Sequence, residues 1–214
     1  MKVSKQFTCG LKTALCMAVL VFGMLALTRD ARADLVIGAY PAIANAGSTN
    51  NTFEVYLINA GTSSVDIEGF SYEINVATAN INLTGATTAT VINPYIFGAD
   101  SLFGPNIATA TGQTLDASDI DAAGSVTVAA GQTFGLGLIT FDVAPGTAAG
   151  PYTVSFTGYP FTDLADASGN DITNFTTVDG LITVTGGVTP APEPSTLLLL
   201  GCGLGTLLRL RRRR

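Results

Sequence analysis

The sequence lacks most of the side chains on which enzymes depend. Its 214 residues include no histidine and no tryptophan, and residues 34 to 187 also lack cysteine, lysine and arginine. These absences exclude Ser-His-Asp and Cys-His catalysis, Schiff-base lysines, Walker-type phosphate loops and His-ligated zinc from this span. Paired carboxylates, as in a glycosidase, are the catalytic chemistry that remains. Sugar sites of that kind usually also carry tryptophan or basic groups, so we expect no enzyme, no catalytic residue and no cofactor.

Positive charge is missing from the centre of the chain. All ten Lys and Arg lie at the two ends, five within 1–33 and five within 209–214, whereas fourteen of the sixteen acidic residues lie within 34–187. Fourteen acids and no base give this span a net charge of −14, which the whole-chain value of −6 conceals. Such a span repels nucleic acid and anionic lipid and attracts cations or basic partners. All cysteines also lie outside it, so it must fold without disulfides: Cys9, Cys16 and Cys202.

The first 33 residues have the pattern of a secretory signal peptide. Three lysines precede an apolar run over 13–28, and Ala31 and Ala33 supply the small residues that signal peptidase prefers. We predict cleavage directly before Asp34, with signal peptidase as a partner. The following span would then be exported across the inner membrane.

The end of the chain has the pattern of a weak membrane anchor. Residues 196–208 carry no charge and are mostly Leu and Gly. As a helix they would reach about 20 Å at ~1.5 Å per residue, less than the ~30 Å hydrocarbon core. Arginines at one end of an apolar segment hold that end on the cytoplasmic side. Five of them follow this run: Arg209, Arg211, Arg212, Arg213 and Arg214.

This tail resembles the PEP-CTERM sorting signal of Gram-negative bacteria over residues 191–214. The resemblance rests on Pro192, Glu193, Pro194 and Ser195, followed by the apolar run and the arginines in the order typical of the family. It implies that an exosortase-type membrane protease recognises the Pro-Glu-Pro motif and processes the chain for the cell surface or the exopolysaccharide matrix. The alternative is an ordinary tail anchor, 196–214, behind a proline-rich linker, 188–195.

Period-two alternation of apolar residues dominates residues 34–187. The segments TFEVYLIN, GFSYEINV and FGLGLITFDV each place apolar side chains on one face, and SVTV, YTVSF and LITV continue the pattern between Gly, Asn, Asp and Pro. No amphipathic helix of useful length is present. Short strands at this spacing predict an all-β fold, and mixed strand lengths favour a single β-sandwich over a barrel. We expect residues 84–124, rich in Thr, Ala, Gly and Asn, to form long loops with one or two short strands.

The order of these segments resembles a cohesin-like module. FEVYLIN, IEGFSYEINV, LGLITFDV, GPYTVSF and DGLITV follow one another over residues 51–184. Cohesins are jelly-roll β-sandwiches related in fold to carbohydrate-binding modules, and in cellulosomes they bind dockerins. The resemblance implies that fold for residues 34–187 and a dockerin-like partner, but no contact residue can be transferred from hydrophobic pattern alone.

Two acidic segments contain closely spaced oxygen ligands. They are DASDID, with Asp116, Asp119 and Asp121, and DLADASGND, with Asp163, Asp166, Asn170 and Asp171. Calcium takes six to eight oxygen ligands, but neither segment matches an EF-hand loop. Asp, Asn and Gly also favour such loops as turn formers. We therefore predict no metal site, with calcium at the second segment as the alternative.

The sequence predicts a non-enzymatic exported protein: a structural or adhesive component of the envelope or exopolysaccharide matrix, held in the membrane only until it is processed. The alternative is a surface-presented carbohydrate-binding module, or a cohesin that binds a dockerin-bearing partner. Aromatic side chains along one sheet face would favour sugar binding. The tyrosines from which such a strip could form are Tyr40, Tyr56, Tyr72, Tyr95, Tyr152 and Tyr159.

Overall fold

The computed structural model describes residues 34–110 and 112–186. The predicted signal peptide, the proline-rich linker, the apolar run and the arginine cluster lie outside the described residues. Within them, no helix is long and apolar enough to cross a membrane. The only helix there is the 3-10 turn η1 (Gly98–Asp100).

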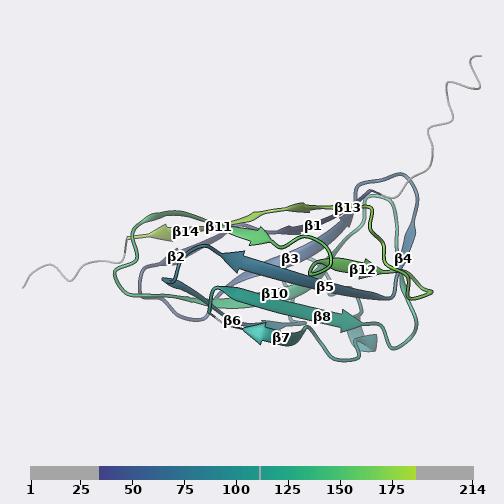
Figure 1. Ribbon diagram of the computed structural model, residues 1–214, viewed down its shortest axis with the longest axis horizontal. Coiled ribbons are helices and arrows are strands. Elements are labelled where there is room, and N and C mark those ends of the chain that lie inside the picture. The colour runs from purple at the N-terminus through teal and green to yellow at the C-terminus, as the bar shows by residue number, and fades with distance from the viewer. Residues whose placement is uncertain (1–33, 111, 187–214) are drawn as a thin grey trace, which may run out of the picture.

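Two β-sheets pack against each other as a β-sandwich (Figure 1). The five-stranded sheet has the order β13 (Phe175–Val178), β1 (Leu35–Ala39), β3 (Asn51–Asn59), β10 (Thr133–Val143), β6 (Ile81–Thr87). The seven-stranded sheet has the order β2 (Ala42–Asn45), β14 (Gly180–Thr185), β11 (Gly150–Phe156), β5 (Gly69–Val76), β8 (Thr114–Ile120), β7 (Asn106–Ala110). Its last member, β12 (Asp163–Ala165), pairs with β5. A separate ladder joins β4 (Val65–Ile67) to β9 (Val126–Val128).

The two sheets are linked by strands that change sheet along the chain. β1 lies in the five-stranded sheet and β2, two residues later, in the seven-stranded one; β13 and β14 do the same. These strands make parallel pairs, β1 with β13 and β2 with β14. As a result, β1 begins at one end of the sandwich and β14 finishes at the opposite end (Figure 1).

The alternation read from the sequence selects the core side chains. Phe53, Val55 and Leu57 of β3 are buried, and so are the apolar residues of β5 at every second position. Phe53 meets Phe141 of β10 with ring centroids 5.7 Å apart. Because apolar side chains gain free energy when they leave water, the two inner faces hold the sheets together. Both sheets and all of this core lie within residues 34–186.

Residues 84–124 are more ordered than expected. β8, with seven residues, lies inside the seven-stranded sheet, between β5 and β7. The two strands β7 and β8 agree with the expectation of one or two strands, but β8 is longer and more central in its sheet than a short strand in a loop region would be. Its buried positions, Leu115 and Ala117, alternate with Asp116 and Ser118, and these polar residues weaken the strand signal in the sequence.

Two buried carboxylates fasten the long connection between β6 and β7. Glu54, 1% exposed, accepts the backbone N–H groups of Val91, Ile92 and Asn93 at 2.8–3.1 Å. Asp119, also 1% exposed, accepts the Tyr95 hydroxyl at 2.7 Å and the Phe103 N–H at 3.0 Å. Tyr95, Ile96 and Phe97 from this connection are thereby inserted into the core. Burial strongly raises the pKa of the Tyr95 hydroxyl, and the neighbouring Asp119 carboxylate raises it further, because a phenolate there would be desolvated and would be repelled by the carboxylate.

Candidate functional site

One edge of strand β5 is shared by two partners, and the chain between them leaves the sheet. β11 pairs with β5 at 74–76, and β12 pairs with it at 69–71. The intervening residues 157–162, Thr-Gly-Tyr-Pro-Phe-Thr, form a loop that we call the flap. Thr162, fully buried, closes its base by donating its hydroxyl to the Thr157 carbonyl at 2.5 Å. Thr157 N–H in turn donates to the Glu73 carbonyl of β5 at 2.9 Å. The flap is therefore tied to the edge of β5 between β11 and β12, where the Ser71 hydroxyl also donates to the Phe161 carbonyl at 3.5 Å.

Exposed apolar side chains gather around the flap. Tyr159 and Phe161 of the flap are each 57% exposed, Phe103 is 63% exposed, and Ile120 at the end of β8 is 44% exposed. Exposed apolar groups of this size are unusual on a sheet face that is otherwise polar. We call this outer surface of β5, β8 and β12, with the flap and Phe103, the flap face.

A hollow of about 270 Å³ lies in the flap face. Its floor follows from the register, because β12, β5 and β8 are adjacent and their outward residues form two rows: Asp163–Ser71–Ser118 and Ala165–Gly69–Ile120. The middle residues, Gly69 and Ser71, have small side chains or none. Ile120 and Phe103 add apolar walls, and Asp163 adds a carboxylate. We call this hollow the socket.

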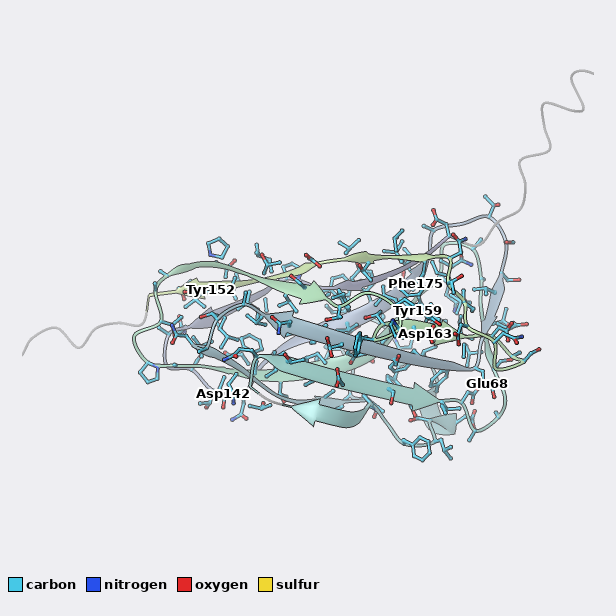
Figure 2. All side chains as sticks on the ribbon, viewed as in Figure 1. Glu68, Asp142, Tyr152, Tyr159, Asp163 and Phe175 are labelled. Atoms are coloured by element: carbon cyan, nitrogen blue, oxygen red, sulfur yellow. The ribbon has the colours of Figure 1, made fainter. Side chains whose placement is uncertain are left out.

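The carboxylate of the socket belongs to a group of close acids. Burial raises the pKa of Asp163 above its usual range, and the neighbouring Asp171 carboxylate raises it further, against the lowering effect of the Leu164 N–H. Asp171 accepts the Tyr159 hydroxyl at 2.9 Å, which ties the flap to this group. Figure 2 shows Tyr159 and Asp163 next to each other, with Asp142 and Tyr152 toward the other end of the sandwich. The flap face is thus anionic as well as apolar.

A second pair of acids faces outward further along β5. Glu73 lies directly opposite Asp116 of β8 in the antiparallel ladder. Like charges in this arrangement destabilise a sheet, since the two carboxylates repel each other. The described residues contain no lysine, arginine or histidine that could neutralise the pair. An external cation or a basic side chain would relieve the repulsion.

The acidic segments singled out in the sequence do not converge on a metal site. In DASDID, Asp116 faces outward whereas Asp119 is buried, because successive strand residues alternate between faces and Asp119 lies three positions on. In the other segment, Asp166 accepts the Ser168 and Asn170 N–H groups at 2.8 and 3.0 Å, a turn within its own loop. These bonds lower the pKa of Asp166. Over residues 34–110 and 112–186, no group of three or more acidic, Cys or His side chains is arranged to hold a metal ion.

The tyrosines do not form a strip on one sheet face. Tyr72 and Tyr95 are buried in the core. Tyr40 and Tyr56 lie against each other, with ring centroids 4.5 Å apart, on the five-stranded sheet. The Tyr56 ring covers Gly38, where any side chain would overlap it. Only Tyr159 belongs to the flap face. The six tyrosines therefore do not provide a strip that would favour sugar binding, and the exposed aromatic rings of the flap face are those of Tyr159, Phe161 and Phe103.

The residues predicted for signal cleavage and sorting lie at or beyond the ends of the described chain. Asp34 is the first described residue, and its carbonyl accepts the Ala60 N–H at 2.8 Å. The cleavage residues Ala31 and Ala33, the sorting motif 192–195 and the terminal arginines lie outside the described residues.

Sequence reasoning missed the roles of Glu54, Asp119 and Thr162. A buried acid in a strand differs from a solvated one only through its partners, and those partners come from distant segments: residues 91–93 for Glu54 and 95–103 for Asp119. One signal was available for Glu54, because it follows Phe53 and precedes Val55 in the most apolar part of β3.

The comparisons with known proteins identify the class of fold. No protein-family model and no curated protein matches the sequence. Among solved structures, the seventh ScaB type I cohesin of Pseudobacteroides cellulosolvens is similar, with a TM-score of 0.54 and 16% identity over 75% of this chain and 97% of that one. The sixth cohesin of scaffoldin B of Acetivibrio cellulolyticus, solved with a mutant Cel5 dockerin, has a TM-score of 0.54 and 14% identity over 71% of this chain and 99% of that one. CaCohA2 of Clostridium acetobutylicum has a TM-score of 0.53 and 16% identity over 74% of this chain and 94% of that one.

These likenesses show that residues 34–186 have the fold of a cohesin, and the expected cohesin-like β-sandwich is confirmed. At such identities the likeness concerns the fold. What the sandwich binds must be argued from its own surface.

Proposed function

We propose that this chain is an exported, non-enzymatic surface protein whose sandwich is a protein-binding module, with the flap face as its docking surface. The observation that carries the proposal is the group of exposed apolar side chains around the flap, including Tyr159, Phe161 and Phe103, on an otherwise polar sheet. Aromatic residues are enriched at the centres of protein interfaces, and polar or charged groups surround them at the rim.

The chemistry of the flap face selects the kind of partner. Apolar side chains give affinity when a partner removes them from water, and the carboxylates of Glu73, Asp116 and Asp163 favour one that presents lysine or arginine. A dockerin-like module with a basic surface meets both requirements. Four of the similar structures contain a cohesin in complex with a dockerin, which supports this choice.

Delivery to the surface completes the proposal. Signal peptidase would cut before Asp34, and an exosortase-type protease would act at Pro192–Pro194. The described chain ends at Gly186 beside β2, at the opposite end of the sandwich from the socket (Figure 1). An anchor following Gly186 would therefore leave the socket toward the end of the sandwich that is farther from the membrane. The protein would serve there, or in the exopolysaccharide matrix, as an adhesive or structural component.

Surface plasmon resonance tests the docking surface. The chain is titrated against a panel of dockerin modules, including the Cel5 dockerin, and against neutral and acidic polysaccharides. We expect binding to a basic dockerin-type module and about a tenfold or greater loss in Phe161→Ser and Ile120→Ser, since buried aromatic and aliphatic anchors dominate interfaces. Ile43→Ser is the matched control: Ile43 is 76% exposed on β2, near the opposite end.

Two results would contradict the proposal. One is binding to polysaccharide alone. The other is dockerin binding that Phe161→Ser and Ile120→Ser leave unchanged, because the contact would then lie elsewhere on the sandwich.

A further inference from the structure

The socket combines apolar walls with a carboxylate that has no cationic partner. Gly69 has no side chain between Ala165 and Ile120, and a Cβ placed there would come within 3.5 Å of the Ile120 side chain and 3.9 Å of Ala165. The open space therefore depends on this glycine. Asp163 Oδ1 accepts the N–H of its own neighbour, Leu164, at 2.7 Å, and its carboxyl group also lies in hydrogen-bonding contact with another acid, Asp171.

We propose that the socket receives a single lysine or arginine side chain of the partner, with its aliphatic stem against Ile120 and Phe103 and its cationic end at Asp163. This inference rests on the proposed protein-binding function and names the part of the partner that enters the flap face.

The shape and chemistry of the socket select this occupant. Lysine and arginine carry a flexible apolar stem that packs on apolar surface while the charged end reaches a polar group. A purely apolar side chain would leave the Asp163 carboxylate, already partly desolvated, without a compensating charge. An acidic or phosphate-bearing group would be repelled, since Asp163, Asp166, Asp171 and Glu68 all lie on this end of the sandwich.

The occupant must come from outside the sandwich. Residues 34–186 contain fourteen acids and no base, so no side chain of the described chain can fill this role. A preference for cations also distinguishes the socket from the rest of the flap face. Tyr159 and Phe161 would contact any apolar partner, whatever its charge.

NMR titration with side-chain mimics tests the socket without the unknown partner. The isotopically labelled full-length chain, in neutral detergent micelles at pH 7 and about 150 mM NaCl, is titrated with n-butylguanidinium and n-butylammonium, and with n-pentanol as the uncharged analogue. At this salt concentration the screening length is ~8 Å, so distant carboxylates contribute little. We expect saturable shifts of the Ser71, Ser118, Ile120 and Ala165 amides, with the cations binding about threefold to tenfold more tightly than n-pentanol.

Three variants locate the effect. Asp163→Asn keeps an acceptor for the Leu164 N–H and should remove the preference for the cations. Ser118→Phe fills the socket from an outward strand position and should abolish binding of all three probes. Asp142→Asn removes the same charge near the other end of the sandwich and should change nothing (Figure 2).

Equal binding of n-pentanol and the cations would overturn the inference, as would an equal loss in Asp142→Asn and Asp163→Asn. The proposed function would survive either result if Phe161→Ser and Ile120→Ser still reduced dockerin binding. Conversely, socket binding of the cations together with intact dockerin binding in those variants would remove the proposed docking surface and leave the cation site.

Discussion

The two buried carboxylates should differ in how much stability they lose when each is changed to the corresponding amide. At Asp119, the two oxygens have different partners. Oδ1 accepts the Phe103 and Ile120 N–H groups at 3.0 and 2.9 Å, whereas Oδ2 accepts the Tyr95 and Ser101 hydroxyls. In Asp119→Asn, the amide oxygen can keep both N–H groups, and the new NH₂ can donate to the hydroxyl oxygens, which accept as well as donate.

Glu54 offers no such solution. Its Oε2 accepts the Val91 and Ile92 N–H groups at 2.8 and 2.9 Å, and its Oε1 accepts Asn93 N–H and Nδ2 at 3.1 and 3.2 Å. Every partner is a nitrogen donor. Rotation of the Asn93 side-chain amide could present an oxygen to a new NH₂, but the Asn93 backbone N–H would still face it. Glu54→Gln therefore leaves at least one buried donor unpaired.

The expected magnitudes follow from these counts. An unsatisfied buried donor costs about 1–3 kcal/mol, and loss of a hydrogen bond to a charged group about 1.5–3 kcal/mol. We expect Glu54→Gln to lower the free energy of unfolding by about 2–3 kcal/mol and Asp119→Asn by about 1 kcal/mol or less. Alanine at either position should cost about 3–5 kcal/mol, since all donors then lose their partner.

Urea unfolding of residues 34–186, followed by far-ultraviolet circular dichroism, measures these differences. This span contains both sheets and the described core. Domains of this size unfold with ΔG of about 5–15 kcal/mol, so the two amide variants are expected to remain folded and measurable. If Asp119→Asn proves as damaging as Asp119→Ala, or if Glu54→Gln is neutral, the assignment of donors and acceptors is wrong.

Four further predictions concern stability and processing. Tyr72→Phe should stabilise the fold by about 1 kcal/mol, because the buried Tyr72 hydroxyl has no hydrogen-bond partner among the described residues; a loss of stability would reveal a bound water. The melting temperature should rise between 10 and 150 mM NaCl, because salt screens fourteen carboxylates that no base compensates, and an unchanged value would exclude self-repulsion as a controlling effect. Stability should also rise as the pH falls from neutral toward the raised pKa of Asp163, because the folded state binds protons there before the unfolded chain does. Asp166, with a lowered pKa, acts oppositely and only below the usual aspartate range. Asp163→Asn should therefore show a smaller rise than the wild type, and equal rises in the two proteins would refute this role of Asp163. Replacing Pro192, Glu193 and Pro194 with Ala should leave precursor in the membrane with Asp34 as its N-terminus, as sequencing and fractionation would show, and unchanged release would reject the sorting signal.

Strong alternation of apolar residues was enough to predict the long strands and the faces that they bury. Phe53, Val55 and Leu57 in β3 and the apolar residues of β5 could be assigned to the core because a strand alternates its side chains whatever it pairs with. The same reasoning extended to the order of the long strands and hence to the cohesin-like sandwich. The absence of bases from residues 34–187 also needed no structure.

Which strands are neighbours, and therefore where the site lies, could be learned only from the folded chain. The socket exists because Gly69, Ser118 and Asp163, far apart in the sequence, meet across β5, β8 and β12. Short strands such as β12 carry too few residues for a periodic signal, and register cannot be read from one strand alone. The environment of each acid also depends on the fold. Asp119 is enclosed by hydroxyl and N–H donors from residues 95–103, whereas Asp163, the same type of residue, borders the socket. Such differences arise from contacts between distant segments, which hydrophobic pattern does not encode.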